Sequence, residues 1–335
     1  MDILIIRFSS LGDVVMTSAA VEALKRNFPE SHIYYLTKKQ YSQIFESDER
    51  IYKVIGITGN ESPFEIAKSL GRKDFDAVID LHGSIRSILV SSALRSPKKL
   101  RIVKHSLARR LMILSRNRYR RTFDFLGSIM DTLKPLDISW REMPKIVPDE
   151  SVADIARSVL NIENGGRDHK IIGIAPGSRH VTKRWNEHSF AGLADAISAN
   201  GDVPVFLGDK SDTPVIDRIG AMIGSEPFSL AGKIDITTTV SVISHLDSLV
   251  TNDSGPMHIA GALGVPCAAV FGPTHPVLGF CPGYPAVSIF HSGAVCSPCS
   301  IHGATPCRMP RRFCMDDITD EAIFDSLYGS KKMFD

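Results

Sequence analysis

The sequence predicts an α/β protein with two doubly wound domains, each built on a parallel β-sheet. Short runs rich in Ile and Val recur along the chain, without the alternation of a half-exposed strand. Each run leads into a polar loop and then into a stretch with helical spacing, and this order of elements restarts near residue 150. The 335 residues suit two domains of about 150 residues each. We therefore expect domains at residues 1–160 and 161–335, facing each other across a cleft.

The first domain is expected to open with a buried strand over residues 2–8. A loop of small residues, Ser9–Asp13, follows it, and apolar residues at helical spacing then predict a helix over 14–28 that Pro29 closes. Later apolar runs predict strands at 33–36, 54–57 and 77–81.

The second domain repeats the pattern. Strands are predicted at 170–175, 203–207, 248–251 and 268–271, and helices at 189–198 and 257–263. Ligands of open α/β sheets bind at the carboxyl ends of the strands. The loops 176–183, 208–212 and 253–258 lie at such ends and are the expected binding loops of this domain.

Several functional classes are excluded or disfavoured by the sequence. Neither first strand is followed by G-x-G-x-x-G, and there is no P-loop, H-E-x-x-H or G-x-S-x-G motif. No apolar run approaches the roughly 20 residues of a membrane span. The first residues lack the basic start and the about 7–15 apolar residues of a secretory signal, so a cytoplasmic protein is expected. Polar strand-end loops in two α/β domains favour group transfer from a nucleotide donor.

Charge is distributed unevenly. Residues 1–150 hold 25 Lys/Arg and 18 Asp/Glu, whereas the remainder holds 14 and 19. Between Asp80 and Asp124 there is no acidic residue and there are twelve basic ones. Such a stretch favours an anionic partner, either nucleic acid, a phosphorylated glycolipid or a membrane surface, and a solvated helix face is the alternative.

Three loops carry candidate chemistry. The helix that begins at Ser254 or Gly255 presents unpaired N–H groups to a diphosphate, unless Asp253 or Ser254 merely caps it. The loop 176–185 carries three clustered basic residues that could close on the diphosphate or be simply solvated. Asp13, near the start of its helix, is expected to be ionised and able to act as a general base, with a plain helix-terminal acid as the alternative.

Four separated segments carry a family resemblance: ILIIRFSSLGDVVMTSAAVEALKRNFP, VIDLHGSIRS, IGIAPGSRHVTKRWNEHSF and LVTNDSGPMHIAGALGVPCAAVFGPTHP. In this order they resemble the motifs of the lipopolysaccharide heptosyltransferases, glycosyltransferase family 9. The resemblance implies a GT-B fold, with the acceptor on residues 1–160 and the sugar nucleotide on 161–335. It also implies inversion at the anomeric carbon without a catalytic metal or other cofactor. The implied donor is ADP-L-glycero-β-D-manno-heptose, and the implied acceptor is phosphorylated Kdo-lipid A or the heptosylated inner core.

The resemblance assigns roles to residues of these motifs. Asp13 matches the catalytic base, and Lys183 matches the phosphate-facing lysine that also serves catalysis. The implied donor-binding residues are Ser178, Lys183, Asp212, Asp253, Ser254, Gly255 and His258. Ser254 stands where the family more often has Thr, and the ribose contact is left between Asp209 and Asp212, with Asp212 preferred. The implied acceptor-binding residues are Ser10, Gly12, His82, Arg86, Arg109, Arg110, Arg120 and Arg121.

All six cysteines lie in the last 70 residues of the chain, from Cys267 onward. Cys296, Cys299, Cys307 and Cys314 begin with a C-x2-C pair and could hold a structural zinc ion. An iron–sulfur cluster, buried thiols or an adventitious disulfide are the alternatives. The segment resembles the end of the heptosyltransferase II branch.

Taken together, these expectations describe an inverting glycosyltransferase, peripheral to the inner face of the inner membrane, with no nucleic acid partner. One alternative is a GT-B transferase that uses another nucleotide sugar or acceptor. The other is a non-catalytic protein that binds nucleic acid or metal through the basic stretch and the cysteines.

Overall fold

The computed structural model describes residues 1–71, 74–115, 122–162 and 167–329. The chain divides into two compact units. The N-terminal unit comprises Met1–Ser106, Phe123–Asp149 and Gly279–Pro282, and the C-terminal unit comprises Leu107–Thr122, Glu150–Leu278 and Gly283–Asp335. The predicted boundary between residues 160 and 161 lies inside the C-terminal unit.

The N-terminal unit contains a parallel five-stranded sheet with the order β3-β2-β1-β4-β5. Its strands are β1 Asp2–Ile6, β2 His32–Lys38, β3 Lys53–Ile57, β4 Ala77–Asp80 and β5 Lys98–Arg101. Its helices are α1 Leu11–Met16, α2 Ser18–Asn27, α3 Lys39–Ser42, α4 Pro63–Ser69, α5 Ile85–Ala93, α7 Phe125–Leu133 and the 3-10 turn η1 Lys134–Leu136. The central strand β1 is buried from Ile3 to Ile6, which explains its continuous apolar run.

The C-terminal unit contains a six-stranded parallel sheet with the order β11-β10-β9-β6-β7-β8. Its strands are β6 Ile171–Ala175, β7 Val203–Phe206, β8 Phe228–Ser229, β9 Ser248–Asn252, β10 Cys267–Val270 and β11 Val287–Phe290. The longer helices are α8 Ala153–Val159, α9 Glu187–Ala199, α10 Thr213–Gly220, α11 Ile236–Ser244, α12 Gly255–Leu263 and α14 Asp320–Tyr328. The short helices are η2 Glu150–Val152, η3 Val181–Lys183, η4 Pro276–Leu278 and α13 Phe313–Asp316. Helix α6, Ser106–Leu114, belongs to this unit from Leu107 onward.

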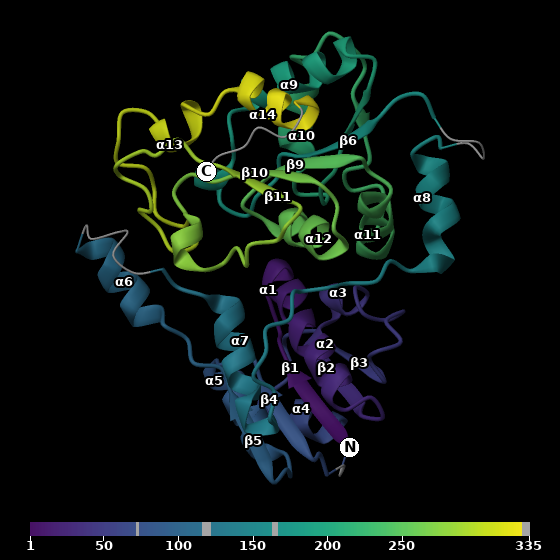
Figure 1. Ribbon diagram of the computed structural model, residues 1–335, viewed down its shortest axis with the longest axis vertical. Helices are drawn as coiled ribbons and strands as arrows, with labels where there is room; N and C mark the ends of the chain where they lie inside the picture. The colour runs from purple at the N-terminus through teal and green to yellow at the C-terminus, as the bar shows by residue number, and fades with distance from the viewer. Residues whose placement is uncertain (72–73, 116–121, 163–166, 330–335) are drawn as a thin grey trace. The chain divides into compact units, whose positions relative to one another are not determined.

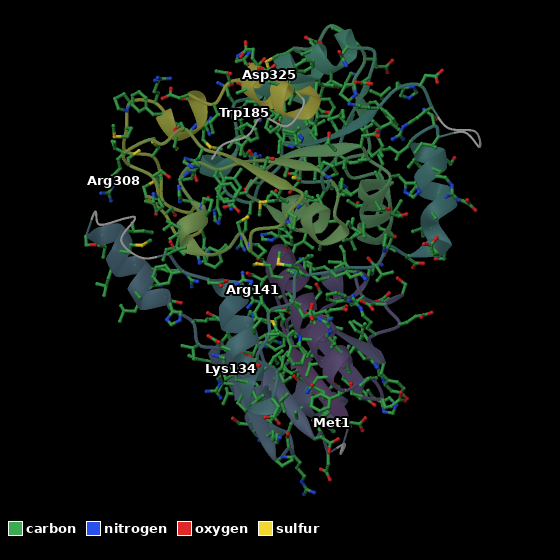
Figure 2. All side chains as sticks on the ribbon, viewed as in Figure 1. Met1, Lys134, Arg141, Trp185, Arg308 and Asp325 are labelled. Atoms are coloured by element: carbon green, nitrogen blue, oxygen red, sulfur yellow. The ribbon has the colours of Figure 1, made fainter. Side chains whose placement is uncertain are left out.

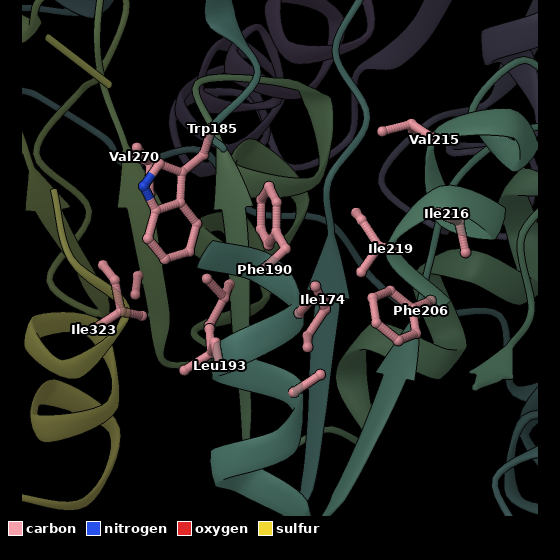
Figure 3. Close-up of a cluster of buried hydrophobic side chains, with 14 of the residues drawn as sticks. Ile174, Trp185, Phe190, Leu193, Phe206, Val215, Ile216, Ile219, Val270 and Ile323 are labelled. Carbon is pink, nitrogen blue, oxygen red and sulfur yellow. The ribbon is translucent and has the colours of Figure 1, made fainter. Parts of the chain in front are cut away.

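Helices cover both faces of the C-terminal sheet, as the doubly wound prediction requires. Helices α9, α10 and α14 lie over one face, and α11 and α12 lie over the other (Figure 1). The core beneath α9 gathers Trp185, Phe190 and Leu193 against Ile174 and Val270 of the sheet (Figure 3). Burying each large apolar side chain contributes about 1.5–3 kcal/mol to folding.

One predicted element differs from the structure. The expected single helix over 14–28 is two helices, α1 and α2, which meet at Thr17. The Thr17 hydroxyl bonds the Val14 carbonyl at 2.7 Å and lies within hydrogen-bond distance of the Tyr35 hydroxyl. A buried polar side chain is satisfied at this junction, and that requirement is not visible in the apolar spacing.

None of the helices described is long and apolar enough to cross a membrane.

Candidate functional site

Asp13 is the third residue of α1 and lies just beyond the carboxyl end of β1. Its Oδ2 atom receives Arg7 Nη2 at 2.6 Å, the Ser10 N–H at 3.0 Å and the Ser10 hydroxyl at 2.8 Å. Arg7 is buried and also donates to the Leu81 carbonyl at 2.6 Å. Asp13 therefore does cap its helix, as the plain alternative proposed, but it is also half of a buried ion pair.

The other carboxylate oxygen of Asp13 is the one available for chemistry. The three donors described all contact Oδ2, and 21% of the side chain remains exposed. Burial alone raises the pKa of Asp13, but the charge of Arg7 and the hydrogen bonds from Ser10 bring it below its ordinary value. The carboxylate is therefore ionised at neutral pH and can accept a proton.

His82 lies in the loop after β4, in the same unit as Asp13. Asp80 holds this loop by accepting hydrogen bonds from the N–H groups of His82 at 2.9 Å and Gly83 at 2.8 Å. Burial and the positive charges of Arg7 and Lys104 lower the pKa of His82 to about 4, so the ring is neutral at physiological pH. Its Nδ1 atom is buried and has no hydrogen-bond partner within the described ranges. Ser10 and Gly12, also predicted here, lie at the start of α1.

The arginines expected to bind the acceptor are placed differently from one another. Arg86 donates to the carbonyl oxygens of Gly59 and Glu61 and so braces a loop of the N-terminal unit. Arg109 is only 4% exposed, and its Nε donates to the Leu278 carbonyl at 2.9 Å within the C-terminal unit. Its contact with the acceptor stays a prediction. Arg110, which follows it in α6, is exposed. Arg120 and Arg121 lie outside the described residues.

Asp253 immediately follows β9 and is buried in the C-terminal unit. Its Oδ2 atom lies 2.7 Å from Lys183 Nζ and accepts a hydrogen bond from the Thr274 hydroxyl at 2.6 Å. Burial raises the pKa of Asp253, but the charge of Lys183 and these hydrogen bonds outweigh it and bring the pKa below its ordinary value. The phosphate-facing lysine of the prediction is therefore paired with an ionised carboxylate.

Helix α12 begins beside this ion pair. Ser254 is its N-cap, but the Ser254 side chain makes no capping hydrogen bond and lies 3.2 Å from the Thr251 hydroxyl. Ser254 therefore does not act as a side-chain cap here, and binding of a diphosphate by the N–H groups of this terminus stays a prediction. Gly255 is the first helical residue, and His258 is buried one turn further on, with Nδ1 3.3 Å from the Tyr284 hydroxyl.

The remaining predicted donor residues lie at the ends of β6 and β7. Ser178 is buried, and its carbonyl accepts from Arg184 Nε at 3.0 Å. The Asp212 carboxylate lies over Gly177, where a Cβ atom would approach it to 2.2 Å. Burial and the charge of Asp209 raise the pKa of Asp212. Asp209 is exposed, and its Oδ1 atom accepts hydrogen bonds from the N–H and the hydroxyl of Ser211, both at 2.6 Å. The preference for Asp212 over Asp209 as the ribose contact stays a prediction.

The four cysteines of the C-terminal segment differ in burial. Within the described ranges, no group of three or more His, Cys, Asp or Glu side chains could hold a metal ion. Cys307 is exposed and lies 3.9 Å from the Met309 carbonyl, whereas Cys314 is buried in the core. Burial, together with the nearby thiols Cys296, Cys299 and Cys307, raises the pKa of Cys314 to about 12. The three other thiols are thus close enough to Cys314 to affect its pKa, and the structural zinc site stays a prediction.

Sequence reasoning did not single out Arg7 and Thr274, which contact the two key carboxylates. A charge at the end of a buried strand needs a partner, and this rule could have linked Arg7 to the next acid along the chain, Asp13. No comparable signal marks Thr274, because its contact with Asp253 depends on the neighbouring positions of β9 and β10 in the sheet.

Comparison with known proteins places the sequence and the fold among heptosyltransferases. A relative from Haemophilus influenzae, named lipooligosaccharide heptosyltransferase 2, is 27% identical over 82% of this chain and 84% of its own. The fold is that of the Escherichia coli ADP-heptose LPS heptosyltransferase II, with a TM-score of 0.75, 20% identity and 98% of both chains covered. An E. coli heptosyltransferase solved with ADP-2-deoxy-2-fluoro heptose matches with a TM-score of 0.66 and 18% identity, over 98% of this chain and 99% of the other.

These likenesses confirm the predicted fold class, two doubly wound parallel-sheet domains of the GT-B type. The model of glycosyltransferase family 9 (heptosyltransferase) matches residues 64–303, well over half of the 335 residues. The match includes Lys183, Asp253 and the start of α12, which form the polar cluster of the C-terminal unit. The chain therefore belongs to glycosyltransferase family 9, the heptosyltransferases.

Proposed function

We propose that this protein transfers a heptose from ADP-L-glycero-β-D-manno-heptose to the inner core of lipopolysaccharide, with inversion and without a catalytic metal. The observation that carries the proposal is Asp13, an ionised and partly exposed carboxylate whose described donors all bind one oxygen. Such a group is suited to take a proton from a sugar hydroxyl. The names of the relatives and of the solved structures support the donor and the acceptor.

In the proposed reaction, Asp13 Oδ1 accepts the proton of the acceptor hydroxyl as its oxygen attacks the anomeric carbon. The new C–O bond forms on the face opposite the leaving group, which accounts for inversion. The bond between the anomeric carbon and the phosphate oxygen breaks, and ADP leaves with the electron pair. Arg7 and Ser10 hold the carboxylate in one orientation throughout, because they stay on Oδ2.

Departure of ADP requires stabilisation of its growing negative charge. Lys183 and the N–H groups at the start of α12 are suited to this, because both present positive charge to the same loop. Asp253 holds the Lys183 ammonium at 2.7 Å, and its own carboxylate can accept hydrogen bonds from sugar hydroxyls.

The proposed acceptor is phosphorylated Kdo-lipid A or an inner core that already carries heptose. The basic stretch supports an anionic acceptor, and among its described arginines Arg110 is exposed for contact with phosphate or with the inner face of the inner membrane. The name of the H. influenzae relative supports the heptosyltransferase II branch.

The proposal is tested by incubating the protein with ADP-heptose and truncated lipopolysaccharides and measuring the product mass. Asp13→Asn should lower turnover by about 10²-fold or more while ADP binding is retained, because only the proton acceptor is lost. Transfer should also persist in EDTA. Near wild-type turnover of Asp13→Asn would show that another group is the base, and a strict need for magnesium would overturn the metal-free scheme.

The same assay distinguishes the alternatives. A panel of nucleotide sugars in thermal-shift measurements identifies the donors that bind. Transfer from a different nucleotide sugar would change the proposed donor but leave the fold and the proposed base as they are. Salt-dependent binding of oligonucleotides with no transfer activity would favour the non-catalytic reading.

A further inference from the structure

The turn Ser297–Gly303 lies between β11 and α13 and contacts two separate segments of the C-terminal unit. The Ser297 hydroxyl donates to the Gly272 carbonyl at 2.6 Å. The N–H groups of Cys299 and Ser300 both donate to the Pro273 carbonyl at 3.0 Å. These bonds fix the backbone just before Thr274, whose hydroxyl contacts Asp253.

The same turn also contacts η3, which carries Lys183. The Thr182 hydroxyl donates to the Gly303 carbonyl, and the Gly303 N–H donates to the Ser300 hydroxyl at 2.9 Å. Downstream of the turn, Arg312 Nη1 donates to the carbonyl oxygens of Val181 at 3.2 Å and Arg184 at 2.9 Å. The basic loop is therefore held on both sides of Lys183.

Gly303 contacts the Lys183 side chain directly. A Cβ atom at Gly303 would lie 2.5 Å from both Cγ and Cδ of Lys183, and Gly303 has a φ of +87°. These two carbons are in the middle of the Lys183 side chain, whose Nζ is fixed on Asp253 at 2.7 Å. An added methyl group would therefore have to move the lysine off its present path.

We propose that the turn Ser297–Gly303 is the element that positions both partners of Asp253, and that Gly303 is the positioning residue that seats Lys183 against the donor diphosphate. The inference rests on the proposed function, in which Lys183 binds that diphosphate. It gives the turn between Cys296 and Cys307 a role in donor binding that requires no metal. Arg308 follows this turn in the sequence; Figure 2 shows it at the periphery of the C-terminal unit, and its side chain is exposed.

The test compares Gly303→Ala with Gly293→Ala, measuring ADP affinity by calorimetry and the melting temperature of each variant. Gly293 is the matched control, because its φ is +71° and no atom lies within 4 Å of a Cβ built there. Gly303→Ala should weaken ADP binding by at least about tenfold, the equivalent of one charge-assisted hydrogen bond, and Gly293→Ala should leave it unchanged.

A double-mutant cycle with Lys183→Ala separates positioning from general damage. If Gly303 acts through Lys183, the double variant binds ADP no more weakly than Lys183→Ala alone. Full additivity of the two losses, or unchanged ADP affinity in Gly303→Ala, would overturn the inference. If Lys183→Ala itself leaves ADP affinity unchanged, the proposed donor role of Lys183 is what fails.

A second variant pair covers the case in which Gly303→Ala does not fold. Thr182→Val removes the hydroxyl that donates to Gly303, whereas Thr182→Ser keeps it. Weaker ADP binding in Thr182→Val with recovery in Thr182→Ser supports the inference, and equal affinity in both contradicts it.

Discussion

The charge state of Asp13 depends on Arg7, whose guanidinium approaches one of the two carboxylate oxygens. Arg7→Gln removes this charge and leaves burial to raise the pKa of Asp13. A base with a raised pKa is protonated at higher pH, so the acid limb of the kcat/KM profile should move to higher pH. Arg7→Lys keeps the charge and should move it less.

This prediction is checked by pH–rate profiles between pH 4 and about 8 for the wild type and both variants. Melting temperatures measured in parallel show whether loss of the Leu81 contact destabilises the fold. Superimposable profiles for wild type and Arg7→Gln would mean that Arg7 does not control the base.

The sequence predicts the positions of single candidate residues in the fold better than it predicts their partners. Asp13, Lys183 and Asp253 follow apolar strands closely in the sequence, so their places beyond strand ends are readable from the chain. The pairing of Lys183 with Asp253 joins positions 70 residues apart and needs the sheet order to bring them together. The burial of Arg109 likewise depends on its contact with Leu278, which no local pattern encodes.

Two adjacent arginines of helix α6 should respond differently to substitution, one in stability and the other in acceptor binding. Arg109→Ala breaks a buried hydrogen bond and should lower the free energy of unfolding by about 1.5–3 kcal/mol. Arg110→Ala, at an exposed position, should change it by less than about 0.5 kcal/mol and should instead raise KM for a phosphorylated acceptor. Urea denaturation and acceptor kinetics on both variants check this. Equal destabilisation by the two substitutions would contradict the assignment.

The C-terminal cysteines should differ in reactivity if no metal holds them. The exposed Cys307 should be alkylated first by iodoacetamide at pH 8, and Cys314 last, because burial raises the pKa of its thiol to about 12 and the thiolate is the reactive form. Mass spectrometry of a time course measures this order. Joint protection of all four thiols, with about one equivalent of zinc by elemental analysis, would instead establish the structural zinc site.

At the level of elements, the sequence predicts long apolar strands well and short or polar ones poorly. The runs at β1, β6 and β9 mark strands buried on both faces. Strand β5 reads Lys-Lys-Leu-Arg, and β8 has two residues, so neither shows a hydrophobic pattern. Both are edge strands of their sheets. They are held by hydrogen bonds to one neighbouring strand rather than by burial of their side chains.

For the whole molecule, acid should lower stability through Asp13 and Asp253. Both have pKa values below the ordinary one in the folded chain, so their contribution is present above the unfolded pKa and is lost as pH falls through the folded pKa. The loss should thus begin below about pH 4. Asp212, whose pKa is raised, opposes the trend. Urea unfolding at several pH values measures the slope, and a wild-type curve parallel to that of Asp253→Asn would exclude a role for Asp253.

The twofold organisation was predictable because the strand–loop–helix pattern repeats, whereas the exchange of short segments was not. Residues 107–122 group with the C-terminal unit and residues 279–282 with the N-terminal unit. Within the first grouping, Arg109 bonds to Leu278. Within the second, the Phe125 N–H donates to the Gly279 carbonyl at 3.1 Å. Both are long-range contacts without a local pattern.

The contact between Lys183 and Asp253 also decides how the protein responds to simple anions. The ammonium and the carboxylate offset each other's charge, so free phosphate or sulfate meets little net attraction at this point. A ligand that separates the pair must replace both lost contacts. It therefore needs an acceptor for Lys183 and hydroxyl donors for Asp253 in the same molecule. A sugar joined to a phosphate supplies both in one molecule. We therefore expect the ion pair to favour a sugar phosphate over the inorganic ions of the surrounding solution.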